Sequence, residues 1–268
     1  MIRDRLQTEL DKYYGYNGDN CVRYTHRLRI DRIGKIIQRC SNSHSESRKP
    51  KALDAGCNHG VYSLLLAEAG CDVLGIDINE QEVARACEWA GERGLQNSVV
   101  FQVGDIQHIN SSDSAFDLIV CSEVLEHLDT PEKGVRELYR VLKPNGIAII
   151  SMPNMGCLFG FLQWTYRKSG IRSALGKPPL DTFQIQHSRY WFGNILKLLK
   201  ENGFQIGEKY STSHLPYVWE IDALLDRFMR ISFASRLESA ISTFPLLRYL
   251  GFNFIVIARK PAIRFSSN

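Results

Sequence analysis

KALDAGCNHGVYSLLLAEAGCDVLGIDIN, residues 51–79, contains two short apolar runs separated by a glycine-containing turn and a helical segment. The first run, KALDAG, predicts a strand that ends in small residues. Apolar side chains then recur at helical spacing from Val61 to Ala69, and Gly70 is typical of a residue that closes a helix. DVLGIDIN predicts the next strand. A strand, a helix and a second strand in this order indicate two parallel strands joined by a right-handed crossover.

The same alternation of strands and helices continues on both sides of this unit. Amphipathic segments predict further helices at 28–40, 80–94, 131–146 and 189–204. Apolar runs predict further strands at 98–106, 116–122, 147–153, 205–211 and 252–261. Helices between consecutive strands are typical of a doubly wound α/β sheet with helices on both faces.

The composition is that of an ordinary globular protein and argues against several other classes. Of 268 residues, 44% are hydrophobic and 23% are charged. The formal net charge is +4, and the sequence has no long basic block of the kind that binds nucleic acid. The seven cysteines contain no Cys-x-x-Cys pair, which argues against a disulfide framework and a zinc ribbon. Because neither a signal-peptide core nor a run of about 18 apolar residues is present, we expect a cytoplasmic protein without a transmembrane segment.

Two segments interrupt the alternation and add length to the sheet. Residues 154–187 are rich in glycine, aromatic residues and lysine, and residues 214–251 contain two apolar helical stretches. We expect one domain over residues 50–261 that carries both insertions, with an N-terminal helical cap and linker at 1–49 and a tail at 262–268. The insertions predict an apolar pocket for a hydrophobic or aromatic small molecule, but a cap that packs on its own core or a homodimer interface fits the same pattern.

Acidic residues stand at the ends of the first three predicted strands, where an open parallel sheet binds its ligand. Asp54 ends the first of these strands in the turn Asp-Ala-Gly-Cys-Asn-His-Gly. This turn has only two glycines, and it has a carboxylate where a dinucleotide would place its pyrophosphate. A carboxylate suits a ligand with an ammonium group, such as the methionine part of S-adenosylmethionine. A simple strand-to-helix turn is the structural alternative.

Asp77 and Asp105 extend this pattern toward a nucleoside. Asp77 lies about 20 residues after the glycine turn, where a carboxylate accepts the two hydroxyls of a ribose, whether of NAD or of S-adenosylmethionine. We expect Asn79, rather than Asp77, to cap the helix that follows. Asp105 can accept a hydrogen bond from an adenine amine while Ile106 packs on the ring. Each carboxylate alone could be a turn residue, but three at successive strand ends favour a binding site.

Five motifs, in order, resemble those of class I S-adenosylmethionine-dependent methyltransferases: LDAGCNHG, GIDIN, GDI, FDLIVCSEVLEHL and ELYRVLKPNGIAIISMPN. The Glu-Val-Leu-Glu-His-Leu segment is most similar to the small-molecule branch, methyltransferase type 11/12-like, that includes ubiquinone-biosynthesis O-methyltransferases. The resemblance implies a Rossmann-like, mostly parallel seven-stranded sheet with an antiparallel last strand, and S-adenosyl-L-methionine as the cofactor. The cofactor-binding residues that it implies are Asp54, Gly56, Cys57, Asn58, Gly60, Asp77, Ile78, Asp105, Ile106 and Cys121.

Asn58 departs from the family, whose members usually have glycine at this position. Asparagine adopts left-handed backbone angles more readily than other non-glycine residues, so the turn can keep its shape. The resemblance also implies that Cys121 lines the floor of the cofactor site through its backbone. A buried strand thiol is the alternative for this residue.

Four residues are catalytic candidates: Glu123, Glu126, His127 and His187. Methyl transfer from a sulfonium is an in-line displacement, in which the protein aligns the nucleophile and a base removes the proton of a hydroxyl. His127 suits the base because the ordinary pKa of histidine is about 6.5. In quinone-pathway relatives the corresponding acidic and histidine residues are associated with a divalent cation, but we assign no metal site. Glu126 and His127 could instead cap the next turn, and His187 could be structural.

We therefore expect an S-adenosylmethionine-dependent methyltransferase that acts at oxygen on a small hydrophobic or aromatic acceptor. Methylation of nitrogen or carbon in a natural product or lipid-linked substrate stays open, as do a non-catalytic cofactor-binding protein and an NAD-dependent dehydrogenase. We expect no nucleic-acid partner and either a monomer or a homodimer, and we leave open a peripheral contact with a membrane. Arg23, Arg27 and Arg29, with nearby tyrosines, are expected either in a lid over the cofactor or in ordinary packing.

Overall fold

The computed structural model describes residues 22–41, 48–154, 192–212, 240–241 and 250–262, and every structural statement below concerns these residues. The expectations for the first part of the N-terminal cap, for both insertions and for the tail fall almost entirely outside them. Within the described ranges, no helix combines the length and the hydropathy that a membrane span requires.

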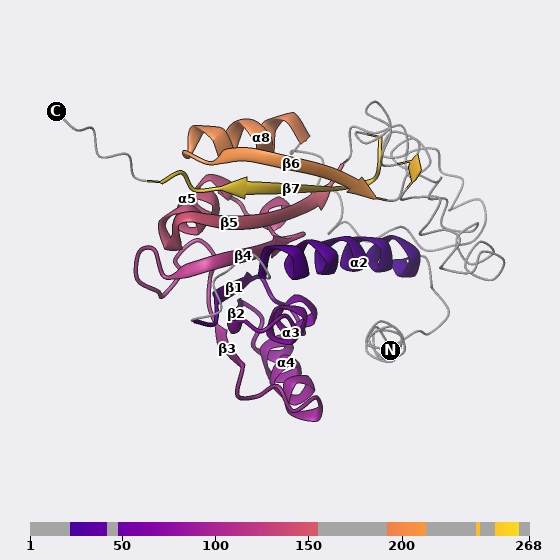
Figure 1. Cartoon of the computed structure of the whole chain (residues 1–268), viewed down its shortest axis with the longest axis vertical. Coiled ribbons are helices and arrows are strands. Elements are labelled where there is room, and N and C mark those ends of the chain that lie inside the picture. Colours follow the sequence, from indigo (N-terminus) through magenta and orange to yellow (C-terminus); the bar gives the residue numbers. More distant parts are fainter. Residues whose placement is uncertain (1–21, 42–47, 155–191, 213–239, 242–249, 263–268) are drawn as a thin grey trace.

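Seven strands form one sheet in the order β3-β2-β1-β4-β5-β7-β6, which confirms the predicted fold class (Figure 1). The strands are β1 (Lys51–Ala55), β2 (Asp72–Asp77), β3 (Val99–Val103), β4 (Phe116–Ser122), β5 (Leu142–Pro153), β6 (Gln205–Thr212) and β7 (Asn253–Arg259). β1 to β5 pair in parallel, and β7 runs antiparallel to its neighbours β5 and β6. The strand order reverses at β1 and β4, and ligands of doubly wound sheets bind at the carboxyl ends of strands beside such a reversal.

Helices cover both faces of this sheet, as the alternating pattern predicted. They are α2 (Val22–Ser41), α3 (Val61–Glu68), α4 (Glu80–Glu92), α5 (Pro131–Val141) and α8 (Phe192–Glu201), with a 3-10 turn, η1, at Leu125–His127. Side chains alternate along each strand, so Ala52 packs in a core with α2 and α3 while Leu53 packs in a core with α5 and α8. Figure 1 shows α2, α3 and α4 on the near side of the sheet.

The prediction of a helix at 131–146 is wrong at its end. α5 stops at Val141, and β5 begins at Leu142. Lys143 precedes a proline, and a residue in that position disfavours helical backbone angles. Asn145 then adopts a φ of 64° and donates its backbone N–H to the carbonyl oxygen of Lys260 at 2.8 Å. This turn lets β5 begin earlier than the apolar run indicated.

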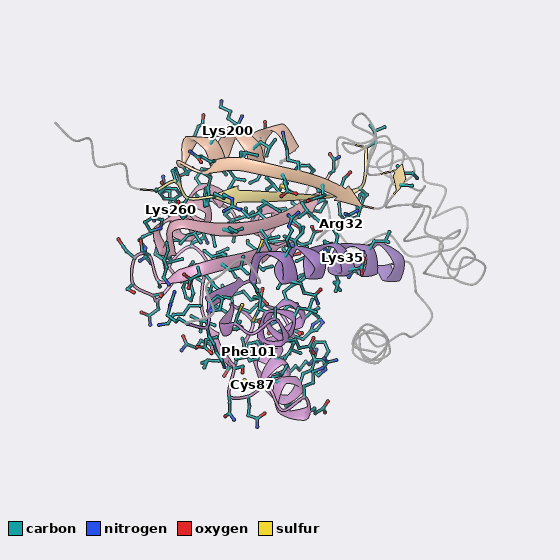
Figure 2. The ribbon with its side chains drawn as sticks, in the orientation of Figure 1. Arg32, Lys35, Cys87, Phe101, Lys200 and Lys260 are labelled. Carbon is teal, nitrogen blue, oxygen red and sulfur yellow. The ribbon has the colours of Figure 1, made fainter. Side chains whose placement is uncertain are left out.

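Gly75, in the middle of β2, is required by the packing around it. A Cβ atom there would lie 2.6 Å from Cδ1 of Phe101 and 2.9 Å from Oγ of Ser63. Figure 2 labels Phe101, whose ring comes from the neighbouring strand β3. Since both neighbours are held in the sheet and in α3, the space cannot open without shifting the core.

We therefore predict that Gly75→Ala lowers the free energy of unfolding by about 1–3 kcal/mol, the usual cost of overpacking a core. Gly91→Ala is the matched control, because a Cβ atom on this residue of α4 meets nothing within 4 Å. In a helix this change should stabilise the protein by about 0.5–1 kcal/mol. Urea unfolding measures both. Equal stability of the two variants would contradict the packing described for Gly75.

Candidate functional site

The turn after β1 needs its two glycines because of backbone angle and packing. Gly56 and Gly60 have φ angles of 78° and 89°, in the left-handed region that favours glycine. A Cβ atom on Gly56 would lie 2.3 Å from Cγ2 of Val124, and one on Gly60 would lie 2.9 Å from Cζ of Phe101. The family resemblance assigns both glycines to the cofactor site. The structure adds a second reason for them, because the side chains of Val124 and Phe101 leave no room for a Cβ atom at either position.

Asp77, at the end of β2, holds this turn in place. Its Oδ2 accepts a hydrogen bond from the backbone N–H of Asn58 at 2.8 Å, and its Oδ1 accepts one from the N–H of Asn79 at 2.9 Å. Asn58 has a φ of 49°, the left-handed angle expected where relatives have glycine. Asn79 caps α4, as predicted. Because each carboxylate oxygen has a second lone pair, Asp77 can still accept hydroxyl donors.

Asp54, the last polar residue of β1, has an incompletely paired carboxyl group. The residue is 1% exposed, and its Oδ2 accepts a hydrogen bond from Oγ of Ser63 at 2.7 Å. Its Oδ1 is buried and has no hydrogen-bond partner. Burial raises the pKa of Asp54 to about 7; the hydrogen bond from Ser63 opposes this rise, and the nearby charge of Asp77 adds to it. A cation beside this group would therefore favour its ionised form.

The end of β3 presents a third carboxylate and an apolar surface close to β2. The backbone N–H of Gly104 donates to the carbonyl oxygen of Asp77 at 2.9 Å, which ties the ends of the two strands together. Asp105 accepts a hydrogen bond on Oδ1 from the N–H of Gln107 at 2.8 Å, so it is also a turn residue. Ile106 is only 5% exposed, whereas Ile78 is 74% exposed. The apolar surface at this edge therefore comes from Ile78 rather than from Ile106.

The two cysteines among the predicted cofactor residues are buried thiols. Cys57 is 4% exposed and Cys121 is fully buried in the core on the α5 side of the sheet. Burial raises the pKa of both thiols, so neither is a thiolate at neutral pH. This agrees with the buried-thiol alternative for Cys121.

Three of the four predicted catalytic residues follow β4 in a short segment. Glu123 has a φ of 58°, which a non-glycine residue adopts only when its surroundings hold it there. Glu126 is 4% exposed with both carboxyl oxygens unpartnered, and burial together with the charge of Glu123 raises its pKa far above the usual range. His127 is more exposed, and desolvation lowers the pKa of its imidazole. Burial therefore favours the neutral form of both Glu126 and His127. His187 lies outside the described residues.

A closed ring of polar side chains includes Glu123 and joins two helices, α2 and α3, to the carboxyl ends of β4 and β5. We call it the Arg29 ring, and its members are Arg29, Tyr62, Ser122, Glu123 and Ser151. Arg29 Nη1 lies 3.0 Å from Glu123 Oε2, and Ser151 Oγ donates to Glu123 Oε1 at 3.2 Å. Ser151 Oγ is 2.8 Å from Ser122 Oγ, which is 3.2 Å from the hydroxyl of Tyr62. Arg29 Nε closes the ring by donating to that hydroxyl at 3.4 Å.

Arg29 is the member that sequence analysis left undecided between a lid and ordinary packing. It is 7% exposed, and its Nη1 also donates to Oδ1 of Asn253 in β7 at 3.3 Å. A buried arginine in the middle of an amphipathic helix is a signal in the sequence, because Arg29 lies between the apolar residues Leu28 and Ile30. The sequence contains nothing that indicates the partner of this arginine.

All of the predicted site residues except His187 lie within the part of the chain that matches a known domain family. Residues 53–150 match the family described as methyltransferase domain. The ubiquinone biosynthesis O-methyltransferase of Rickettsia felis is 31% identical over 140 residues, which cover 52% of this chain and 56% of the relative. The protein of the same name from Rickettsia prowazekii is 32% identical over 144 residues, 53% of this chain and 56% of the relative. The chain thus spans little more than half the length of these curated relatives.

Solved structures share the fold over most of the chain. A putative sarcosine dimethylglycine methyltransferase from Galdieria sulphuraria has a TM-score of 0.58 at 19% identity, with 88% of this chain and 86% of that chain covered. The cyclase SpnF has a TM-score of 0.59 at 22% identity, with 87% and 82% covered. At such low identities the likeness concerns the fold alone. The second of these proteins is a cyclase, so this fold by itself does not indicate methyl transfer.

Because Arg29 neutralises a carboxylate with little exposure, we predict that Arg29→Met costs about 3 kcal/mol of the free energy of unfolding. The matched control is Arg39→Met on the same helix, whose pair with Glu208 is exposed and should contribute less than about 1 kcal/mol. Adding Glu123→Gln to Arg29→Met should recover part of the loss, since no buried charge then lacks a partner. Denaturant unfolding of the wild type and these three variants checks this, and equal losses in Arg29→Met and Arg39→Met would refute it.

Proposed function

Residues 53–150 contain a methyltransferase domain, and on this premise we propose that the chain transfers the methyl group of S-adenosylmethionine to an oxygen of a small hydrophobic acceptor. The observation that carries the proposal is the pair of carboxylates at the ends of β1 and β2. Asp54 has a buried oxygen without a partner, and Asp77 has lone pairs left after it has ordered the neighbouring turn. One carboxylate suits an ammonium group and the other suits vicinal hydroxyls.

The residues present fit this cofactor better than they fit a dinucleotide. A pyrophosphate close to Asp54 would meet like charge, and Asp54 has no lysine or arginine among its hydrogen-bond partners in the described residues. An ammonium would instead give the unpartnered Oδ1 of Asp54 a charged donor. Ile78, with 74% of its surface exposed, offers an apolar face for a purine ring. Oδ2 of Asp105 accepts a long hydrogen bond of 3.5 Å from Nε2 of Gln107, and its second lone pair can accept from an exocyclic amine.

When bound, S-adenosylmethionine supplies an electrophilic methyl group on a sulfonium. The described residues then have to hold an acceptor in line and take up its proton. His127 is suited to the proton, because desolvation lowers the pKa of its imidazole and leaves the ring neutral at pH 7. Oxygen as the nucleophile is supported by the similarity to the ubiquinone biosynthesis O-methyltransferases from Rickettsia. The apolar insertions that led us to expect a hydrophobic acceptor lie outside the described residues.

The pKa of Asp54 gives the cofactor site a characteristic pH dependence. Below pH 7 the carboxyl group is mostly protonated in the free protein and must release its proton when an ammonium binds. We predict that the affinity for S-adenosylhomocysteine, which has the same ammonium group, falls about tenfold per pH unit as the pH is lowered from 7 to 5.5. Asp54→Asn should bind more weakly at pH 7.5 and lose this slope. Calorimetric titration measures both, and an unchanged slope in the variant would exclude Asp54 as its source.

Asp77→Ala should weaken binding of S-adenosylhomocysteine about 10- to 100-fold, because it removes the ribose acceptor and the group that holds Asn58. The fold should persist, since Asp77 is half-buried at the carboxyl end of β2 and belongs to none of the hydrophobic cores. Asp72→Ala is the matched control at the opposite end of β2, where the carboxylate lies 3.8 Å from Lys49 and is half-exposed. The account fails if both variants bind the cofactor as tightly as the wild type.

The direct test of function is transfer of a labelled methyl group from S-adenosylmethionine to a panel of phenols and catechols with alkyl chains of increasing length. We expect label on oxygen, and a faster reaction with the more hydrophobic acceptors. His127→Ala should lower kcat by about 100-fold or more while the affinity for S-adenosylhomocysteine stays the same. Label on nitrogen or carbon only would contradict the assignment to oxygen. Binding of NAD without binding of S-adenosylmethionine would overturn the whole proposal.

A further inference from the structure

We propose that Arg29 is a positioning residue on the acceptor side of the site. Its guanidinium holds the carboxylate of Glu123 and occupies the position that a divalent cation bound to Glu123 would need. This inference rests on the proposed function in one respect: the name acceptor side comes from that function. It concerns Glu123, Glu126 and His127, for which the family resemblance described above implies an association with a divalent cation. The geometry of Arg29 and Glu123 points to a different arrangement in this chain.

Both oxygens of the Glu123 carboxylate have a partner in the Arg29 ring. Oε2 lies 3.0 Å from Arg29 Nη1, and Oε1 accepts a hydrogen bond from Ser151 at 3.2 Å. A divalent cation at this carboxylate would have to come within about 2.0–2.6 Å of an oxygen, and it would then lie close to a permanently charged guanidinium. The two positive charges would repel each other in a site with little water to screen them. Arg29 and a metal ion therefore compete for one position.

With Arg29 paired to Glu123, the neighbouring side chains do not complete a metal site. Glu126 is 4% exposed and its oxygens have no hydrogen-bond partner, and the charges of Glu123 and Arg29 both act on it. Among the residues that the structure describes, no three His, Cys, Asp or Glu side chains come together as a donor set. Mg²⁺ binds proteins through one or two carboxylates and keeps several waters, so removal of Arg29 would leave Glu123 and Glu126 open to such an ion.

Arg29 is itself held firmly from several directions. Its Nε donates to the hydroxyl of Tyr62 from α3, and its Nη1 donates to Oδ1 of Asn253 from β7. These contacts fix the guanidinium relative to the sheet and, through it, the left-handed backbone of Glu123. The helix α2 thus reaches the carboxyl ends of β4 and β5 with a positive charge. Lysine could keep the charge but not the fork of donors that makes these contacts.

The test is a titration with Mn²⁺, followed by electron paramagnetic resonance, on the full chain without any methyl donor or acceptor. We expect the wild type to show no Mn²⁺ binding that depends on Glu123 up to about 1 mM. Arg29→Gln should gain a site at least about tenfold tighter than any in the wild type, and adding Glu123→Gln should abolish that gain. Arg39→Gln, on the same helix, should gain nothing. Arg29→Lys should stay close to the wild type because it keeps the positive charge.

Wild-type Mn²⁺ binding that Glu123→Gln removes would overturn the proposal, and so would the absence of any gain in a folded Arg29→Gln. If Arg29→Gln does not fold, the comparison of the wild type with Glu123→Gln still decides it. Methyl transfer by the wild type should also be unchanged after treatment with a chelator. The Mn²⁺ titration needs no turnover, so failure of the proposed methyl transfer and failure of this inference are distinguishable.

Discussion

A carboxylate buried at the carboxyl end of β1 constrains the rest of the site. Burying an ionised group without full pairing is costly, and the cost appears here as the raised pKa of Asp54. Ser63 of α3 pairs one oxygen, and the absence of a side chain at Gly75 leaves room for Ser63 to do so. The other oxygen has no partner within the described residues. A ligand with a positive charge at this point would offset the cost of burying the carboxylate of Asp54 with one oxygen unpartnered.

The two halves of the site treat buried negative charge in different ways. On the side of β1 and β2, Asp77 orders the turn at Asn58, and both Asp54 and Asp77 keep acceptor capacity for a ligand. On the side of β4 and β5, the charge of Glu123 is met by the internal cation Arg29. The first arrangement is open to a cationic small molecule, and the second is closed by the protein. This division agrees with a protein that exchanges one ligand at the first half and aligns a neutral acceptor at the second.

The sequence predicted those features that depend on neighbours along the chain. The order of strands and helices, the cap at Asn79 and the left-handed Asn58 all follow from local patterns. Features that depend on packing between distant segments could not be predicted: the contact of Arg29 with Asn253 joins residues 224 positions apart. For the same reason the burial of Ile106 and the exposure of Ile78 were not foreseen, because both follow an aspartate at a strand end and only the packing of α5 separates them.

The measurement that tests the central claim most directly is a crystal structure with S-adenosylhomocysteine bound. The account predicts that the ammonium lies within hydrogen-bonding distance of Asp54, directly or through one water molecule, and that the ribose hydroxyls donate to Asp77. It also predicts that the Arg29 ring keeps the contacts described above. A nucleoside bound away from the ends of β1 and β2, with Oδ1 of Asp54 still unpartnered, would contradict it.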